Sequence, residues 1–352
     1  MAGDISLAEL QLATRNHGMP LEALRWDVTP VGLHYVLIHY DIPEVDTASW
    51  RLQVGGLVER PLSLSLDDLR ARPASEVAVT MECAGNGRAQ LEPHVESQPW
   101  LLEAVGTALW RGVPVAALLD EAGLGEGATD ALFTGLDRGV EGGEEQLYQR
   151  SVSLEELRAC EALLAYELNG VPLPPQHGFP LRLVVPGWYG MTSVKWLSEI
   201  SLSDAPFDGY QMSQAYRMRS AEDEVGEPVS RIAPRSLMVP PGIPEFLSRS
   251  RVVTAGPCEL HGRAWSGEGE IVGVEVSTDG GASWAAAELG DAALGRWAWR
   301  AWSFRWDAEP GDYVLCCRAR DGAGNEQPLE APWNVGGYMN NSVHRVSVTV
   351  TG

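Results

Sequence analysis

Lysine is nearly missing from this 352-residue sequence: among its 26 basic residues, Lys195 is the single lysine. The basic residues are outnumbered by 48 acidic ones, which gives a net charge of −22. Because a surface of this sign repels the phosphate backbone of DNA and RNA, we expect no nucleic-acid partner. A lone lysine in a chain that uses arginine everywhere else predicts a specific partner for its side chain.

Long apolar runs are missing as well. No stretch approaches the roughly 18 apolar residues that a membrane helix requires, so we expect no membrane span. The first residues lack the basic segment and apolar segment of an export signal. The sequence therefore predicts a cytoplasmic protein.

Cysteine is sparse, and its spacing excludes two common kinds of site. The five cysteines contain no C-x-x-C pair, which argues against a zinc knuckle and a redox dithiol. An odd number of cysteines scattered along a long chain is typical of reduced thiols. The sequence also lacks a P-loop, a dinucleotide-binding glycine fingerprint and the G-x-S-x-G elbow of hydrolases. No common motif of these kinds therefore names the function.

The length predicts two domains, and the pattern of polar and apolar residues changes between them. Alternating polar and apolar residues recur beyond residue 252 and are typical of a β-sandwich of immunoglobulin type. We expect an N-terminal arm over 1–30, an α+β domain over 31–233, a proline-rich linker over 234–251 and the sandwich over 252–352.

Short strands and helices alternate in the predicted α+β domain. Ser65 is expected to cap a short helix, and Gly123 is expected to end another. Strands are predicted over 34–42, 77–81 and 181–185, and helices over 115–122 and 154–166.

The segment Thr80–Gln90, T-M-E-C-A-G-N-G-R-A-Q, is the first candidate for chemistry. Cys83 follows a predicted strand and precedes a loop with two glycines and Arg88. A thiolate at a strand end, with backbone amides and a cation nearby, suits a nucleophile or a metal ligand. The alternative is an inert cysteine that is buried for packing.

Two further segments suggest an anion-binding pocket. His177, Arg182, Ser193 and Lys195 lie on glycine- and proline-rich turns that flank the predicted strand 181–185. Cations and hydroxyls on such turns suit a phosphate-bearing ligand, although ordinary surface ion pairs would give the same pattern. The loop G-Y-Q-M-S-Q-A-Y-R that begins at residue 209 adds tyrosines for an oxyanion pocket or for packing between domains. These residues do not name the reaction.

The sequence is similar to the sulfite oxidase family of molybdenum enzymes. C-A-G-N-G-R at 83–88 resembles the family's C-A-G-N-R-R, and A-Y-E-L-N-G at 165–170 also matches. H-G-F-P-L-R-L-V-V-P-G at 177–187 and S-V-K-W at 193–196 are similar to its molybdopterin-binding stretch. A-W-S-G, V-E-V-S-T-D-G-G and W-N, which begin at residues 264, 274 and 333, resemble its immunoglobulin-like dimerisation domain. The resemblance therefore implies a molybdopterin domain, an immunoglobulin-like domain and a homodimer.

The resemblance also implies a cofactor, molybdenum bound to molybdopterin, and a role for individual residues. Cys83 would bind the molybdenum. The pterin and its phosphate would be held by His39, Asp137, His177, Arg182, Ser193 and Lys195. The substrate pocket would be lined by Arg88, Trp100 and Tyr216.

Two departures from the family concern the substrate. Sulfite oxidases carry pocket arginines at the positions of Leu37 and Gly336, so two of three expected cations are replaced here. We expect weaker sulfite binding unless Arg138 or Arg217 compensates. A second R-N-H, which begins at Arg15, is interpreted as a coincidence, because the family's motif aligns with residues 37–39.

The leading hypothesis is an oxidoreductase that converts sulfite to sulfate by oxo transfer. Its electrons would pass to an external acceptor, cytochrome c or oxygen, because no cytochrome b5 domain precedes the molybdopterin domain. The alternatives are a reductase of S-oxides or N-oxides on the same cofactor, and a cofactor-carrying or structural homodimer without turnover.

Overall fold

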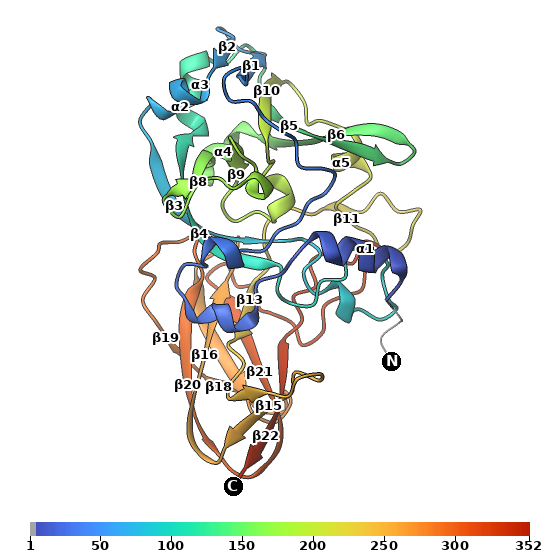
Figure 1. Cartoon of the computed structure of the whole chain (residues 1–352), viewed down its shortest axis with the longest axis vertical. Coiled ribbons are helices and arrows are strands. Elements are labelled where there is room, and N and C mark those ends of the chain that lie inside the picture. Colours follow the sequence, from blue (N-terminus) through green and yellow to red (C-terminus); the bar gives the residue numbers. More distant parts are fainter. Residues whose placement is uncertain (1–4) are drawn as a thin grey trace.

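The computed structural model describes residues 5–352 as two lobes (Figure 1). The N-terminal two thirds of the chain form the upper lobe in this view, and the C-terminal third forms the elongated lower lobe. Within the described part, no helix has the length and apolar character that crossing a membrane requires.

The upper lobe contains one mixed sheet, in which β1 and β10 run parallel, and one antiparallel sheet, and both present strand ends to the candidate site. The first sheet has the order β2 (Leu62–Leu64), β1 (Leu52–Gly56), β10 (Leu197–Ser203), β5 (Asp130–Glu141) and β6 (Glu144–Ser153). The second has the order β3 (Ser75–Glu82), β4 (Val105–Pro114), β7 (Leu163–Leu168) and β8 (Val171–Pro172), with β9 (Arg182–Val184) paired to β7.

Short helices connect several of these strands, and the residues at the helix ends explain where the helices begin and stop. Helix α2 (Leu66–Arg70) begins at Ser65, whose hydroxyl accepts a hydrogen bond from the backbone N–H of Asp68. Helix α3 (Val115–Ala122) ends at Gly123, whose φ of 72° favours glycine. Both predicted helix boundaries are confirmed. The remaining short helices of the lobe are α4 (Leu154–Ala159) and α5 (Tyr210–Ser213).

Two predicted elements of this lobe are wrong. Residues 34–42 form no strand: Val36 makes an isolated bridge to His17, and the rest of the segment is irregular extended chain. The helix predicted over 154–166 ends at Ala159; Glu161 then adopts a left-handed φ of 56°, and β7 follows. The apolar residues of β7 are buried on both faces, so they lack the alternation that distinguishes a strand from a buried helix.

The N-terminal arm has more structure than its sequence suggested. Helix α1 (Leu7–Arg15) begins with a capping box, in which Ser6 and Glu9 each accept a hydrogen bond from the other's backbone N–H. Farther along the arm, Met19 and Leu24 are buried in a core that also contains Trp265 and Trp299 of the lower lobe. The arm therefore helps to join the two lobes.

The lower lobe is a β-sandwich of immunoglobulin type. One sheet has the order β13 (Arg235–Met238), β16 (Gly256–Trp265), β20 (Arg300–Ala308) and β19 (Glu288–Leu289). The other has the order β14 (Ile243–Pro244), β15 (Arg251–Thr254), β22 (His344–Thr351), β21 (Gly311–Asp321), β17 (Ile271–Ser277) and β18 (Ala285–Ala286). The hairpin of β11 (Arg217–Met218) and β12 (Glu227–Pro228) precedes the sandwich. The segment 234–251, expected to be a linker, thus carries β13 and β14.

A buried ion pair crosses the boundary between the lobes. Nη1 of Arg235, on β13, lies 2.6 Å from Oε1 of Glu82 at the end of β3, and both side chains are at most 2% exposed. The indole N–H of Trp265 donates to the second carboxylate oxygen at 2.8 Å, and the amide of Asn86 donates to the first at 3.0 Å. The carboxylate next to Cys83 is therefore held by the lower lobe.

Candidate functional site

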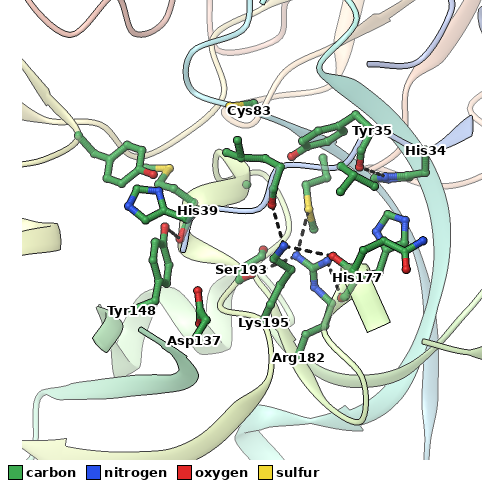
Figure 2. A pocket seen from close by; sticks show the side chains of 17 residues that line it. His34, Tyr35, His39, Cys83, Asp137, Tyr148, His177, Arg182, Ser193 and Lys195 are labelled. Atoms are coloured by element: carbon green, nitrogen blue, oxygen red, sulfur yellow. Dashed lines mark hydrogen bonds between the residues drawn. The ribbon is translucent and has the colours of Figure 1, made fainter. Parts of the chain in front are cut away.

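A pocket in the upper lobe brings most of the predicted site residues together (Figure 2). Its cavity of about 70 Å³ lies between the irregular segment 34–39, the end of β3 and the turns on either side of β9. Eight of the ten residues that the sequence singled out line it: His39, Cys83, Asp137, His177, Arg182, Ser193, Lys195 and Tyr216. The other two, Arg88 and Trp100, are buried but do not line it.

Cys83 is presented by a tight loop at the end of β3. Its backbone N–H donates to Ala104 at 2.9 Å, and its carbonyl accepts from Asn86 at 3.0 Å, so the loop is fixed on both sides of the sulfur. Gly87 has a φ of 92°, which an L side chain rarely adopts. Burial raises the pKa of the Cys83 thiol, while the charge of Arg88 acts in the opposite direction. A bound metal cation would overcome the cost of burial and stabilise the thiolate.

Arg182 and Lys195 form the opposite, cationic side of the pocket, below Cys83 in Figure 2. The guanidinium of Arg182 donates to the carbonyl oxygens of His177 at 3.1 Å and Ser193 at 3.0 Å, and thereby ties the two turns together. Nζ of Lys195 donates to the carbonyl oxygens of Leu37 at 2.7 Å and Gln176 at 3.1 Å. The lone lysine thus joins the segment 34–39 to the turn that precedes β9.

A bulge in the first sheet aims a carboxylate at this cationic side. The register of β5 against β6 shifts between Thr134 and Arg138, and Asp137 lies in this irregularity. Burial raises the pKa of Asp137, although the charge of Lys195 counteracts the rise. Burial and the neighbouring charge of Arg182 lower the pKa of Lys195. Both side chains are therefore poorly solvated, and the buried Oδ1 of Asp137 is left to accept from an additional polar ligand.

Several buried polar atoms of this region lack a partner among the described residues. They include Oδ1 of Asp137 and the Nε2 atoms of His177 and His34. Burial lowers the pKa of His34 to about 4, so its ring is neutral near pH 7; because Nδ1 donates to the carbonyl oxygen of Tyr35 at 3.2 Å, Nε2 is left as an acceptor. A flat, polar heterocycle with a phosphate tail fits unsatisfied donors and acceptors combined with two cations. The molybdopterin that the resemblance implies is such a group.

Sequence reasoning missed part of the pocket wall. His34, Tyr35 and Tyr148 line the pocket, and the first two belong to the segment that had been predicted as a strand. Tyr148 donates a hydrogen bond to the carbonyl oxygen of Met191 at 2.8 Å and contacts the ring of His39 at a centroid distance of 5.2 Å. Two histidines five residues apart in H-Y-V-L-I-H were the available sequence signal.

The R-N-H segment that begins at Arg15 runs beside the pocket wall without lining it. Arg15 donates to the carbonyl oxygen of Tyr40 at 2.6 Å, and Oδ1 of Asn16 accepts from the backbone N–H of Ile38 at 2.6 Å. His39 does line the pocket and lies 3.0 Å from the Glu141 carboxylate. These contacts support the assignment of His39, rather than His17, to the site.

Arg88 is held behind Cys83 by the loop that carries Gly336. Its Nε donates to the carbonyl oxygen of Gly336 at 2.9 Å, its Nη1 donates to that of Gln98 at 3.2 Å, and the guanidinium lies 5.2 Å from the ring centre of Tyr338. A Cβ at position 336 would overlap the Tyr338 ring. The tyrosine thus occupies the space next to the residue that replaces the family's arginine.

Neither arginine considered as a replacement for the missing cations lines the pocket. The side chain of Arg138 is 70% exposed and pairs with Glu145. The guanidinium of Arg217 donates to three backbone carbonyl oxygens, those of Met212, Val225 and Gly226. The structure therefore brings neither Arg138 nor Arg217 into the pocket.

The chain matches two family models in the order of its lobes. Residues 39–211 match the oxidoreductase molybdopterin binding domain, and residues 231–351 match the Mo-co oxidoreductase dimerisation domain. These matches identify a molybdopterin-binding domain that is followed by a Mo-co oxidoreductase dimerisation domain.

Sequence identity to known proteins identifies the family within this class of molybdopterin-binding proteins. Sulfite oxidase of Gallus gallus is 37% identical over 337 residues, which cover 90% of this chain and 72% of that protein. Mitochondrial sulfite oxidase of Mus musculus is 36% identical over 92% of this chain, which spans 62% of its length. The chain belongs to the sulfite oxidase family.

Two further similar proteins carry other names. An NADH nitrate reductase of Brassica napus is 33% identical over 92% of this chain and 38% of its own length. The crystal structure of the sulfane dehydrogenase SoxCD from Paracoccus pantotrophus matches with a TM-score of 0.80 and 27% identity, over 95% of this chain and 86% of that one.

Proposed function

We propose that the protein oxidises sulfite, or a related small sulfur oxyanion, to the next oxidation level by oxo transfer, and passes the electrons to an external acceptor. The observation that carries this proposal is the pocket itself. It sets the thiol of Cys83 opposite the cationic turns of Arg182 and Lys195, and the polar side chains of His177 and Asp137 flank these two cations. This is the arrangement that a metal-bearing pterin with a phosphate group requires.

The residues that line the pocket, together with Arg88 and Trp100 beside it, divide into three tasks. Cys83 holds the metal; His39, Asp137, His177, Arg182, Ser193 and Lys195 hold the pterin and its phosphate; Arg88, Trp100 and Tyr216 form the substrate side. The bound cofactor supplies the oxo group and accepts the electrons of the substrate. The protein orients the anion, excludes water from the buried thiolate and keeps the neutral rings of His34 and His177 as hydrogen-bonding partners.

A second candidate substrate is sulfane sulfur. It is favoured by the replacement of two family arginines by Leu37 and Gly336, which makes this pocket less cationic than that of a sulfite oxidase. It is also favoured by the similarity along 95% of the chain to a protein described as a sulfane dehydrogenase. The third possibility to be tested is the reduction of an S-oxide on the same cofactor. Steady-state assays with sulfite, thiosulfate and dimethyl sulfoxide separate the three possibilities.

Cys83→Ser tests the metal ligand. We expect a folded protein in which sulfite-to-cytochrome c activity falls by a factor of at least about 10³, because serine is a poor substitute for a thiolate on a soft metal site. X-ray absorption of the purified holoprotein should show one sulfur neighbour fewer in this variant.

Cys258→Ser provides the matched control, because this half-buried cysteine lies on β16 of the lower lobe. It should retain both the activity and the full sulfur coordination. An unchanged sulfur count in Cys83→Ser would remove Cys83 from the metal and would overturn the proposed site.

A further inference from the structure

Arg150 is a buried cation of the upper lobe that no sequence pattern had singled out. It lies on β6, and 2% of its surface is exposed. Within the described chain no carboxylate pairs with it; its Nη1 donates to the carbonyl oxygen of Gln211, and its buried Nε has no acceptor. A buried charge without a counter-ion is costly, so it needs a reason to be retained.

The guanidinium of Arg150 is close to the substrate side of the pocket. It lies 5.5 Å from the ring centre of Tyr216, which lines the pocket. The ring of Tyr216 lies 5.3 Å from that of Tyr338, which in turn contacts Arg88. A chain of contacts thus runs from Arg150 through two tyrosines to Arg88.

The two other arginines that had been considered for this task are not available. Arg138 is exposed, and the donors of Arg217 are directed to backbone carbonyl oxygens. Arg182 and Lys195 belong to the opposite side, below Cys83 in Figure 2. Of the cations discussed for this site, Arg150 and Arg88 are therefore the two that lie buried on the Tyr216 side of the pocket.

We propose that Arg150 is a specificity-determining residue that attracts an anionic substrate through its buried charge behind Tyr216. This inference rests on the proposed function and deepens it, because it assigns the substrate to the oxyanions. Arg150 acts through Tyr216 and does not touch the substrate. From its place on β6, it replaces part of the positive potential that is lost at Leu37 and Gly336.

The test compares Arg150→Gln and Arg150→Lys holoenzymes. For Arg150→Gln, we expect the KM for sulfite and the Kd for sulfate, measured by titration calorimetry on the oxidised enzyme, to rise about tenfold, because the field of one buried charge is lost. The kcat should change by less than about threefold, since the charge acts on binding of the anion. Arg150→Lys keeps the charge and should stay within about threefold of the wild type in both constants.

Arg263→Gln is the matched control. Arg263 is also a buried arginine that stacks on an aromatic ring, Trp299 at 5.8 Å, but it belongs to β16 of the lower lobe. This variant should leave both the KM and the sulfate Kd unchanged. It reports what the loss of a buried arginine does to the protein in general.

Two results would overturn the role of Arg150. One is a folded Arg150→Gln enzyme with an unchanged sulfate Kd; the other is an Arg150→Lys enzyme that loses sulfate binding, which would mean that packing and not charge matters. If Arg150→Gln does not fold, Arg150→Lys decides the question. Absence of sulfite turnover in the wild type would overturn the proposed function, whereas sulfate calorimetry would still decide the role of Arg150.

Discussion

The residues of this site show how one position can change what its neighbours do. Gly336 lies where the resemblance implies an arginine of the family, and the space beside it is taken by the ring of Tyr338. This ring then contacts both Tyr216 and Arg88, and the carbonyl oxygen of Gly336 holds Arg88 in place. The loss of one cation is thus coupled to a repacked substrate side.

His344 makes stability depend on pH. It is buried at the start of β22, and its Nδ1 accepts a hydrogen bond from the backbone N–H of Met238 at 3.0 Å. Burial, assisted by the charge of Arg235, lowers its pKa from 6.5 to about 3. Above pH 6.5 the ring is neutral in both states; as pH falls toward 3 the unfolded chain binds the proton first, so stability is lost at about 1.4 kcal/mol per pH unit.

Urea unfolding between pH 7 and pH 4 measures this loss. The variant His344→Asn should lose less stability on acidification than the wild type, because its unfolded state has one proton fewer to bind. His261→Asn, at an exposed histidine of β16, should behave as the wild type does. Equal pH dependence of the wild type and His344→Asn would contradict the prediction.

At the scale of elements, the important contact is the one between β3 and β13. The ion pair of Glu82 and Arg235 is buried, and Trp265 and Asn86 satisfy the remaining positions of the carboxylate. Since β3 delivers Cys83 to the pocket, a strand of the lower lobe helps to fix the strand that carries the candidate metal ligand. The two lobes are therefore coupled through a few strongly interacting side chains.

Arg235→Met should destabilise the protein by about 3–5 kcal/mol, because it leaves the carboxylate of Glu82 buried and unpaired. The double variant Arg235→Met with Glu82→Gln should recover most of this loss, since no buried charge remains. The free energy of unfolding in urea, measured for the two single variants and the double variant, gives the coupling. A double variant as unstable as the sum of the single ones would show that the pair is not coupled.

At the scale of the whole molecule, the match of residues 231–351 to a dimerisation domain predicts a homodimer. Two large apolar side chains of this lobe, Phe246 and Leu247, are 82% and 84% exposed in the turn between β14 and β15. Exposed neighbouring apolar side chains are typical of protein contact surfaces. We expect them to be covered by the second chain.

Sedimentation measures this expectation. The wild type should sediment with twice the 38.1 kDa mass of one chain. The double variant Phe246→Ser with Leu247→Ser should dissociate into monomers at a protein concentration at least about tenfold higher than the wild type does. The reason is that two apolar side chains contribute a few kcal/mol when they are buried in an interface. Val225→Ser, at a residue 76% exposed that precedes β12, serves as the control. A dimer of unchanged strength in the double variant would place the interface elsewhere.

The site could be predicted from the sequence better than the strands around it. Cys83 and the turns of His177 and Lys195 belong to contiguous motifs, so their resemblance to the family brought them together before any geometry was known. The wall formed by His34 and Tyr148 was missed because its order comes from tertiary contacts, not from a local pattern. Arg150 was missed for the same reason: a single arginine on a strand gives no signal until its neighbours in space are known.

The lone lysine has a practical consequence. Lys195 carries the chain's single side-chain amine, and its Nζ lies in the wall of the pocket, held by the carbonyl oxygens of Leu37 and Gln176. An amine-acylating reagent therefore has one lysine to modify, and a filled pocket should shield it. The mass added at this residue would then report, molecule by molecule, how much of a preparation has been loaded.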